Sequence, residues 1–326
     1  MFINSERIRK MKRINGTWFE FQHHNIPEGK YWNPICIHFS DEQWRQKIRE
    51  VNSLGMKYVV LLCTALFDKA YFKTDIYPRF ELAATDPLEA ILDEADKCGM
   101  KIFMSAGFYG TWTETYNNMV SKEVEKRAFQ AMDELFALYG HHDSFYGWYL
   151  PDEAWIGGYF NEDFMKFINA YTAHARTLKK GFTNLIAPYG TKDTIPDDKY
   201  VKQLESIDID IIAYQDEVGV QKTTSLETPR FYEGLRKAHD KAGRSALWAD
   251  MEVFEFEGDV YKSALYAADM ERIERQIKSI SPYVDEILIY QYEGMFNKPG
   301  TIAYCGHPAS VKLYNDYKAW LEKNFK

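Results

Sequence analysis

The chain has 326 residues, of which 46% are hydrophobic and 27% charged, an ordinary composition for a globular protein. Its net charge of −8 argues against nucleic acid as a partner, because nucleic-acid binding requires a basic face. No apolar run approaches the length of a membrane span, and residues 1–13 are too charged for a signal peptide. As it stands, the sequence predicts a cytoplasmic protein, or a periplasmic or surface protein if a signal peptide has been removed.

Cysteine spacing predicts neither a disulfide framework nor a metal centre. Cys36, Cys63, Cys98 and Cys305 match no metal-binding motif, and Cys63 and Cys98 lie in apolar segments. We interpret all four as free thiols, and we expect no metal and no cofactor.

Eight apolar segments have the length and composition of buried strands. In chain order they span residues 14–22, 58–66, 101–110, 145–153, 183–189, 209–217, 245–253 and 286–293. Each is followed by a segment with apolar residues at helical spacing, often with a glycine at its end. These predicted helices span residues 41–54, 86–98, 121–139, 161–180, 197–206, 228–242, 268–280 and 308–324.

This alternation predicts a parallel α/β fold. Each helix–strand unit has the size that a parallel crossover requires. A single (β/α)8 TIM barrel over residues 1–326, with 1–13 as an N-terminal extension, uses every predicted element. A doubly wound open sheet is the alternative. It would place a glycine-rich phosphate turn after the first strand, and the sequence has none there.

The fourth predicted strand ends in a motif that suggests a site. Its aromatic run stops at Pro151 and is followed by two adjacent acids, Asp152 and Glu153. Proline ends regular pairing because it has no N–H to donate. Acids at the carboxyl end of a barrel strand lie where barrel enzymes place their chemistry. A helix N-cap by Asp152 is the structural alternative, and the recurrence of acids on other strands favours a site.

Acids recur at or near the carboxyl ends of strands 1, 4, 6, 7 and 8. They are Glu20, Asp152, Glu153, Asp216, Glu217, Asp250, Glu252 and Glu293. Strands 6 and 8 end in similar sequences, Tyr-Gln-Asp-Glu and Tyr-Gln-Tyr-Glu. Because side chains two apart share a face, Gln215 lies beside Glu217, and Gln291 beside Glu293. Amides next to carboxylates suit sugar hydroxyls, whereas a polar layer that only closes the barrel is the structural alternative.

Aromatic residues accompany these acids, and their rings can pack against the C–H groups of a sugar. The residues that we expect to bind substrate are Glu20, Tyr109, Trp112, Asp152, Trp155, Gln215, Glu217, Trp248, Gln291 and Glu293, with Trp148 and Tyr292 as further candidates for a groove. Acids and aromatics in a barrel mouth indicate glycoside hydrolysis, in which one carboxylic acid protonates the leaving oxygen while another attacks the sugar or activates water. The predicted partner is an oligosaccharide or polysaccharide.

The eightfold pattern, with Trp-Tyr-Leu-Pro-Asp-Glu ending strand 4 and an acid ending strand 7, resembles the large clan of barrel glycosidases. The whole chain is also similar to an uncharacterised family of glycosidase-like TIM-barrel domains common in gut Bacteroidetes. The resemblance to the clan implies that Glu153 is the acid/base and Glu252 the nucleophile. The clan usually has Asn before the strand-4 acid and Pro after it, whereas this chain has Asp152 and Ala154.

Alternation along strand 7 supports the choice of Glu252. Trp248, Asp250 and Glu252 share one face of the strand, which directs Glu252 into the barrel mouth. An inverting mechanism would leave Glu217 or Glu293 as alternatives for the base.

Two other functions stay open at this point. A metal-dependent hydrolase would need histidines that share a face, but His23 and His24 are adjacent and would point to opposite faces of a strand. A non-catalytic carbohydrate-binding barrel would keep the aromatic residues without needing two facing carboxyl groups. The sugar, the linkage and the oligomeric state do not follow from the sequence.

Overall fold

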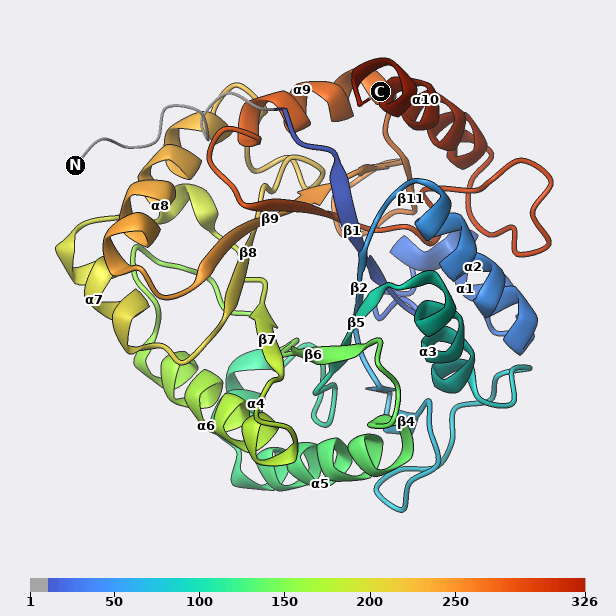
Figure 1. The fold of residues 1–326 in the computed structure, drawn as a ribbon, viewed down its shortest axis with the longest axis horizontal. Coiled ribbons are helices and arrows are strands. Elements are labelled where there is room, and N and C mark those ends of the chain that lie inside the picture. Colours follow the sequence, from blue (N-terminus) through green and yellow to red (C-terminus); the bar gives the residue numbers. More distant parts are fainter. Residues whose placement is uncertain (1–10, 326) are drawn as a thin grey trace.

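The computed structural model describes residues 11–325, and within them eight parallel strands close a barrel that helices surround (Figure 1). The barrel strands are β1 (Ile14–Phe19), β2 (Tyr58–Leu61), β5 (Lys101–Ser105), β6 (Phe145–Tyr149), β7 (Thr183–Ile186), β8 (Ile211–Gln215), β9 (Ala246–Glu252) and β12 (Glu286–Tyr290). Their order around the barrel follows the chain, and β1 pairs with β12 to close it. The predicted (β/α)8 TIM barrel is confirmed.

The proposed N-terminal extension, residues 1–13, lies mostly outside the described part of the chain. Residues 1–10 and residue 326 are not described. A single domain over the full range 1–326 therefore stays a prediction.

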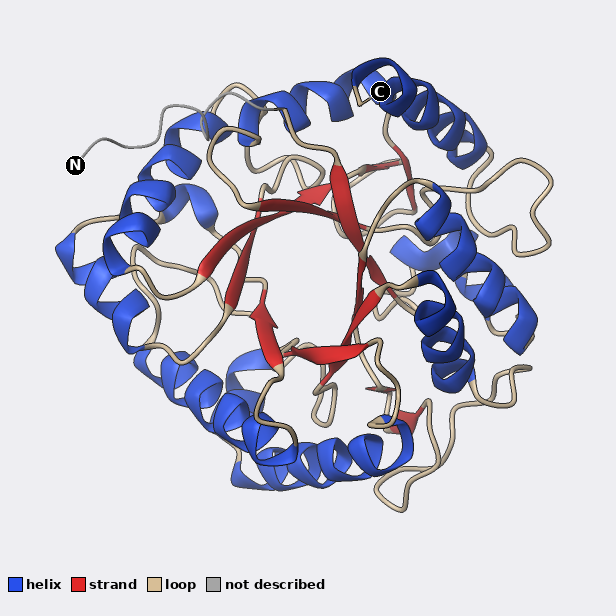
Figure 2. Cartoon of the chain, viewed as in Figure 1, coloured by secondary structure: helices blue, strands red, loops and turns tan. Residues whose placement is uncertain are grey.

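The predicted helices form the outer layer of the barrel (Figure 2). They are α2 (Asp41–Ser53), α3 (Pro87–Cys98), α5 (Lys122–Tyr139), α6 (Glu162–Leu178), α7 (Asp198–Ser206), α8 (Thr228–Ala242), α9 (Met270–Ile280) and α10 (Ala309–Asn324). Side-chain caps fix where several of them begin. Ser40 and Gln43 form a capping box on α2, and Asp86 accepts the Glu89 N–H on α3. α3 ends at Gly99, whose φ of 64° is left-handed.

Apolar side chains fill two layers of this structure. The larger layer lies between the outer faces of the strands and the helices, and the smaller one fills the barrel interior. The interior layer includes Trp18, Phe103, Tyr149, Trp248 and Leu288. Because consecutive strand residues point to opposite faces, each barrel strand contributes to both layers.

β6 and β7 approach each other closely at Gly147. A Cβ atom built there would lie 1.6 Å from the carbonyl oxygen of Thr183. A side chain at this position would push the two strands apart. The absence of a side chain at Gly147 therefore allows β6 to pair closely with β7. This pairing positions the acidic residues that follow β6.

The loops at the carboxyl ends of the strands contain short elements that sequence periodicity does not predict. The predicted strand 58–66 divides, because β2 ends at Leu61 and a hairpin follows it. The additional elements are the hairpin β3 (Ala65–Leu66) and β4 (Lys69–Ala70), the hairpin β10 (Phe254–Phe256) and β11 (Leu265–Ala267), the helices α1 (Asn33–Cys36) and α4 (Thr115–Val120), and the 3-10 turns η2 (Glu28–Tyr31) and η3 (Thr191–Asp193).

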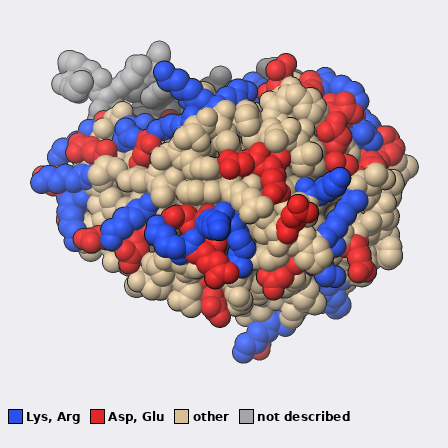
Figure 3. All heavy atoms as spheres, turned by 90° about the horizontal axis from the view of Figure 1, so that it is seen from below, with Lys and Arg blue, Asp and Glu red and all other residues tan. Residues whose placement is uncertain are grey.

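The surface charges, the helices and the cysteines can be compared with what the composition predicts. Acidic and basic side chains are interspersed over the face shown in Figure 3. Across residues 11–325, no helix combines the length and the apolar character that crossing a membrane demands. All four cysteines are free thiols, as predicted; Cys98 is partly exposed and the other three are buried.

Candidate active site

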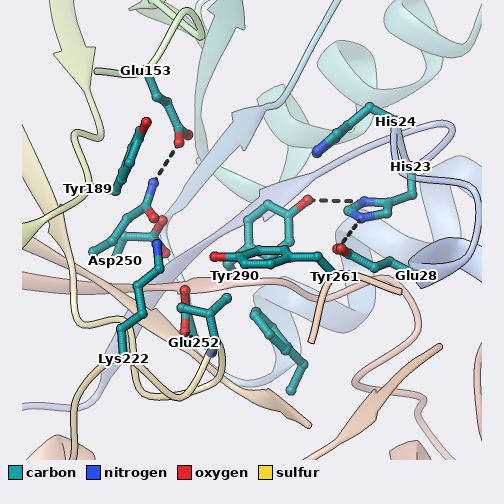
Figure 4. A pocket seen from close by; sticks show the side chains of 13 residues that line it. His23, His24, Glu28, Glu153, Tyr189, Lys222, Asp250, Glu252, Tyr261 and Tyr290 are labelled. Carbon is teal, nitrogen blue, oxygen red and sulfur yellow. Dashed lines mark hydrogen bonds and ion pairs between the residues drawn. The ribbon is translucent and has the colours of Figure 1, made fainter. Parts of the chain in front are cut away.

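A cavity of about 380 Å³ lies at the carboxyl ends of the barrel strands (Figure 4). Strands β8, β9 and β12 contribute to it, together with loops that follow β1, β6, β7, β8 and β9. The lining residues are His23, His24, Glu28, Glu153, Tyr189, Gln215, Val220, Lys222, Asp250, Glu252, Phe254, Tyr261 and Tyr290. Four of these side chains are acids, which gives the cavity a strongly carboxylate character.

Glu153 follows β6 and is held by two donors. Tyr149 Oη donates to its Oε1 at 2.8 Å, and Gln215 Nε2 donates to its Oε2 at 2.7 Å. Burial raises the pKa of Glu153 to about 7, and the negative charges of Asp152 and Glu217 add to this effect. The two hydrogen bonds partly offset the rise. The carboxyl group therefore exchanges a proton near neutral pH.

Glu252 is the last residue of β9 and is 5% exposed. The backbone N–H of Val220, in the loop after β8, donates to its Oε2 at 2.8 Å. Burial raises the pKa of Glu252 to about 8, with the nearby charge of Asp216 as the next cause. One oxygen of Glu252 is thus fixed by the backbone.

Asp250 lies two residues deeper on the same face of β9. Its Oδ1 is buried and accepts no hydrogen bond from the described residues. Burial and the charges of Glu153 and Glu252 raise its pKa well above the usual value. The raised pKa favours the neutral form of Asp250, which limits the charge that accumulates in the cavity.

Asp216 ties the end of β9 to the loop after β8. Its Oδ1 accepts the backbone N–H of Glu252 at 3.0 Å, and Gln276 Nε2 donates to its Oδ2 at 2.7 Å. The side chain is fully buried. Asp216 does not line the cavity, so its contribution is to hold the backbone that carries Glu252.

A second group of charges lies on the opposite side of the cavity, in the segment after β1. His23 bonds Glu20 through Nδ1 at 2.9 Å and Glu28 through Nε2 at 3.0 Å. Burial alone would lower the pKa of His23, but the two carboxylates outweigh it and raise the pKa to about 9. His23 is therefore a buried imidazolium between two carboxylates at neutral pH.

His24 differs from its neighbour in charge. Burial, followed by the positive charge of His23, lowers the pKa of His24 to about 3. Its ring packs against Trp112 at a centroid distance of 4.6 Å, and its Nδ1 has no hydrogen-bond partner among residues 11–325. Figure 4 shows the ring pointing toward the cavity. His24 thus offers a neutral imidazole to a ligand.

Glu20, His23 and His24 are close enough to be considered as metal ligands, since their ligand atoms lie within 4.8 Å of one another. However, Trp32 Nε1 and Gln291 Nε2 already donate to Glu20 Oε1 at 2.8 and 2.6 Å. Both nitrogens of His23 are also bonded to carboxylates. We therefore interpret this group as a hydrogen-bonded ion pair.

The structure brings three of the predicted site residues, Glu153, Gln215 and Glu252, onto one cavity. Other predicted residues lie behind its wall: Glu20 and Gln291 are bonded to each other there, and Glu217 accepts the backbone N–H groups of Gly190 and Thr191.

Three further predicted residues, Asp152, Trp112 and Trp155, do not line the cavity. Asp152 accepts from Asn118 Nδ2 at 3.0 Å, and burial raises its pKa to about 6. Trp112 backs His24. Trp155 is 55% exposed, and its backbone forms a bridge with that of Tyr189, which lines the cavity.

Three predicted substrate-binding residues lie elsewhere, which corrects their expected positions. Trp248 is near the start of β9, where it packs against Tyr58 at 4.8 Å, so it lies at the amino-terminal end of the barrel. Tyr109 is buried with its hydroxyl 2.9 Å from Thr64 Oγ1. Glu293 is fully buried. Burial raises its pKa well above the usual value; the nearby Cys305 raises it further, and the ammonium group of Lys47 lowers it.

Trp148 and Tyr292 also lie outside the cavity. Trp148 packs against Phe145 and Phe182, while Tyr292 donates to Glu50 Oε2 at 3.2 Å. Strand alternation explains Trp148, because Tyr149 faces the barrel interior and its neighbour must face the helices.

Sequence reasoning missed most of the cavity residues that loops supply. They are His23, His24, Glu28, Tyr189, Val220, Lys222, Phe254 and Tyr261, together with Tyr290 at the end of β12. The repeated Tyr-Gln motif contained a signal for Tyr290. The loop residues carry none, because their positions depend on contacts between segments far apart in the chain.

Similar folds occur among glycosidases of known structure. The chain superposes on a protein of Bacteroides thetaiotaomicron VPI-5482 that is provisionally assigned as an alpha-L-fucosidase, with a TM-score of 0.74 and 16% identity over 95% of this chain and 96% of that one. It is also similar to the endo-1,4-beta-mannanase from Rhizomucor miehei, with a TM-score of 0.55 and 9% identity over 96% and 95% of the two chains.

A third similar structure is the GH2 beta-galacturonidase from Eisenbergiella tayi, with a TM-score of 0.56 and 13% identity over 96% of this chain. This chain spans 52%, about half, of that larger protein. At such identities the likeness shows the fold alone, which is a glycosidase-like TIM barrel.

Sequence comparison identifies the family. A search among curated proteins finds no match. One family model matches residues 14–303, a range that contains every residue lining the cavity. The chain therefore belongs to the family described as "Domain of unknown function (DUF4434)".

Proposed function

We propose that the protein is a glycoside hydrolase in which Glu153 is the general acid and Glu252 the nucleophile or general base. The observation that carries the proposal is that these two acids, one after β6 and one at the end of β9, line a single cavity. Most glycoside hydrolases use such a pair of carboxyl groups. The likeness of the fold to glycosidases supports the same conclusion.

Glu153 suits the role of the acid. A pKa of about 7 keeps its proton available near neutrality. As the C–O bond to the leaving group breaks, this proton moves to the departing oxygen. Tyr149 and Gln215 hold the two carboxyl oxygens in place and stabilise the carboxylate that is left.

Glu252 suits attack on the sugar, directly or through a water molecule. The Val220 N–H fixes one oxygen and favours the carboxylate form, which is reached as the pH rises through the pKa of about 8. Positive charge develops on the sugar ring in the transition state. The carboxylate of Glu252 therefore stabilises the transition state more than the neutral substrate, which is the requirement for catalysis.

Substitution of each acid tests these roles on aryl glycosides of different sugars. E153Q and E252Q should each lower kcat by about 10²–10⁴-fold on a substrate with a poor leaving group. A good leaving group needs no protonation, so it should restore much of the rate to E153Q and none to E252Q. Glu271, whose side chain is 83% exposed on α9, provides the control E271Q, which should behave as wild type.

Two results would contradict the proposal. Near wild-type turnover in both variants on a confirmed substrate would exclude the assigned roles. Saturable binding of an oligosaccharide by the wild-type protein, without hydrolysis across the panel, would instead indicate a carbohydrate-binding barrel.

A further inference from the structure

Two loop segments separate the cavity from a second hollow in the surface. They are residues 23–34, after β1, and residues 257–264, at the tip of the β10–β11 hairpin. Four residues of these segments line the cavity: His23, His24, Glu28 and Tyr261. The second hollow, of about 590 Å³, is lined by other residues of the same segments: Ile26, Pro27, Lys30, Asn33, Pro34, Glu257, Lys262, Ser263 and Ala264. We call the place where the two segments meet the partition.

Direct contacts hold the partition closed. Asn25 Nδ2 donates to the carbonyl oxygen of Tyr261 at 3.1 Å and to Glu28 Oε1 at 2.5 Å. Glu257 pairs with Lys30 at 3.1 Å and accepts from the hydroxyl of Tyr31. The two segments, more than two hundred residues apart in the chain, are thus joined at several points.

Lys222 extends this barrier to the loop after β8. Its Nζ lies 5.7 Å from the centre of the Tyr261 ring and 5.2 Å from that of Tyr189. It also pairs with Glu217 at 3.3 Å. The cavity therefore has a wall of contacting side chains that runs from the segment after β1, through the hairpin, to the loops after β7 and β8.

The position of the acid decides where the leaving group passes. The group that protonates the departing oxygen must lie beside that oxygen, so the leaving group is bound on the Glu153 side of the cavity. Trp155, two residues further along the chain, is 55% exposed. Figure 4 shows Glu28 on the side of the cavity away from Glu153, and Tyr261 reaching from that side toward Lys222. The sugar that is cleaved off must therefore fit between Glu153 and the partition.

The cavity is small for a polysaccharide. Its volume of about 380 Å³ is near the lower end of the ~300–1,000 Å³ range of ligand pockets. It has room for a short saccharide, and the joined segments of the partition lie between it and the second hollow.

We infer that the protein acts on chain ends and removes terminal sugar units from the non-reducing end of its substrate. This inference rests on the proposed function and adds the mode of action to it. The partition determines the mode, because it blocks the far end of the subsite that holds the cleaved sugar.

The products formed earliest in the reaction test the inference. An oligosaccharide of the sugar whose aryl glycoside is hydrolysed carries a fluorescent label at its reducing end. Chain-end action should release a single short product and leave labelled chains that shorten by that same unit. Labelled fragments of mixed length at the earliest times would overturn the inference while leaving the proposed hydrolysis intact. Absence of hydrolysis in the wild-type protein on every substrate would overturn both.

Opening the partition tests its role. Tyr261 has a φ of 63°, which glycine adopts without strain, so Y261G removes the ring and keeps the hairpin backbone. Combined with N25A, it should raise kcat/KM at least fivefold for substrates with a two-unit non-reducing portion, relative to those with one. D68G is the matched control, because Asp68 is also exposed with a positive φ of 54° but does not line the cavity.

An unchanged ratio in the folded double variant would show that the partition does not set the mode of action. The same rise in D68G would also contradict the inference, because it would arise without any change to the partition.

Discussion

Removal of the Tyr149 hydroxyl should change the pH dependence of the proposed reaction in a defined direction. Tyr149 is fully buried, and its Oη donates to Glu153 Oε1 at 2.8 Å. This hydrogen bond favours the carboxylate form of Glu153 and so lowers its pKa. In Y149F the ring remains in the barrel interior and only the donor is lost. The pKa of Glu153 should therefore rise above its present value of about 7.

The size of the rise follows from the strength of the bond. A hydrogen bond to a charged group contributes about 1.5–3 kcal/mol. One pKa unit corresponds to about 1.4 kcal/mol, so the pKa of Glu153 should rise by about 1–2 units. A general acid loses activity as the pH rises through its pKa. The alkaline limb of kcat/KM against pH should therefore move upward.

The assay is the pH dependence of kcat/KM on an aryl glycoside with a poor leaving group. Tyr146 provides the control, since it lies on the same strand and packs against Phe103, and it does not line the cavity. Y146F should leave the profile unchanged. A downward shift of the alkaline limb in Y149F, or the same upward shift in Y146F, would refute the reasoning.

Periodicity along the chain was sufficient to predict the barrel. Each predicted strand contains a barrel strand, and each predicted helix agrees with an observed one within about two residues. The reason is physical, because burial on both faces gives barrel strands continuous apolar runs, while helices carry apolar residues on one side. Strand ends were less predictable. Strand β6 ends at Tyr149, so Asp152 and Glu153 occupy irregular backbone beyond the ladder.

Apart from Glu153, the cavity residues that were predicted are those whose direction strand geometry determines. Gln215 and Glu252 close regular strands and face the cavity as alternation predicts. Glu293 lies beyond the end of β12, where alternation no longer holds, and its side chain is buried away from the cavity. Trp248 lies on the predicted face of β9 but not at the predicted end of the barrel. It precedes Glu252 by four residues and therefore lies at the amino-terminal end.

The cavity wall could not be predicted, since it depends on pairs such as Asn25 and Tyr261 that meet across the fold. The spacing of apolar residues predicts which face of a helix or strand is buried. It does not predict which loops contact each other.

Two predictions concern stability. G147A should lower the free energy of unfolding by about 3 kcal/mol or more, because its Cβ would lie 1.6 Å from the Thr183 carbonyl oxygen. G181A should change it little, since a Cβ there has no described atom within 4 Å; urea unfolding compares the two. The second prediction concerns His23, whose pKa rises from 6.5 to about 9 on folding. Since folding raises this pKa, the stabilisation is complete below pH 6.5 and is lost as the pH approaches 9. The rise corresponds to about 3 kcal/mol. Between pH 6 and pH 9, wild type should therefore lose about 3 kcal/mol more than H23Q in urea unfolding. Equal losses would show that the buried imidazolium does not stabilise the fold.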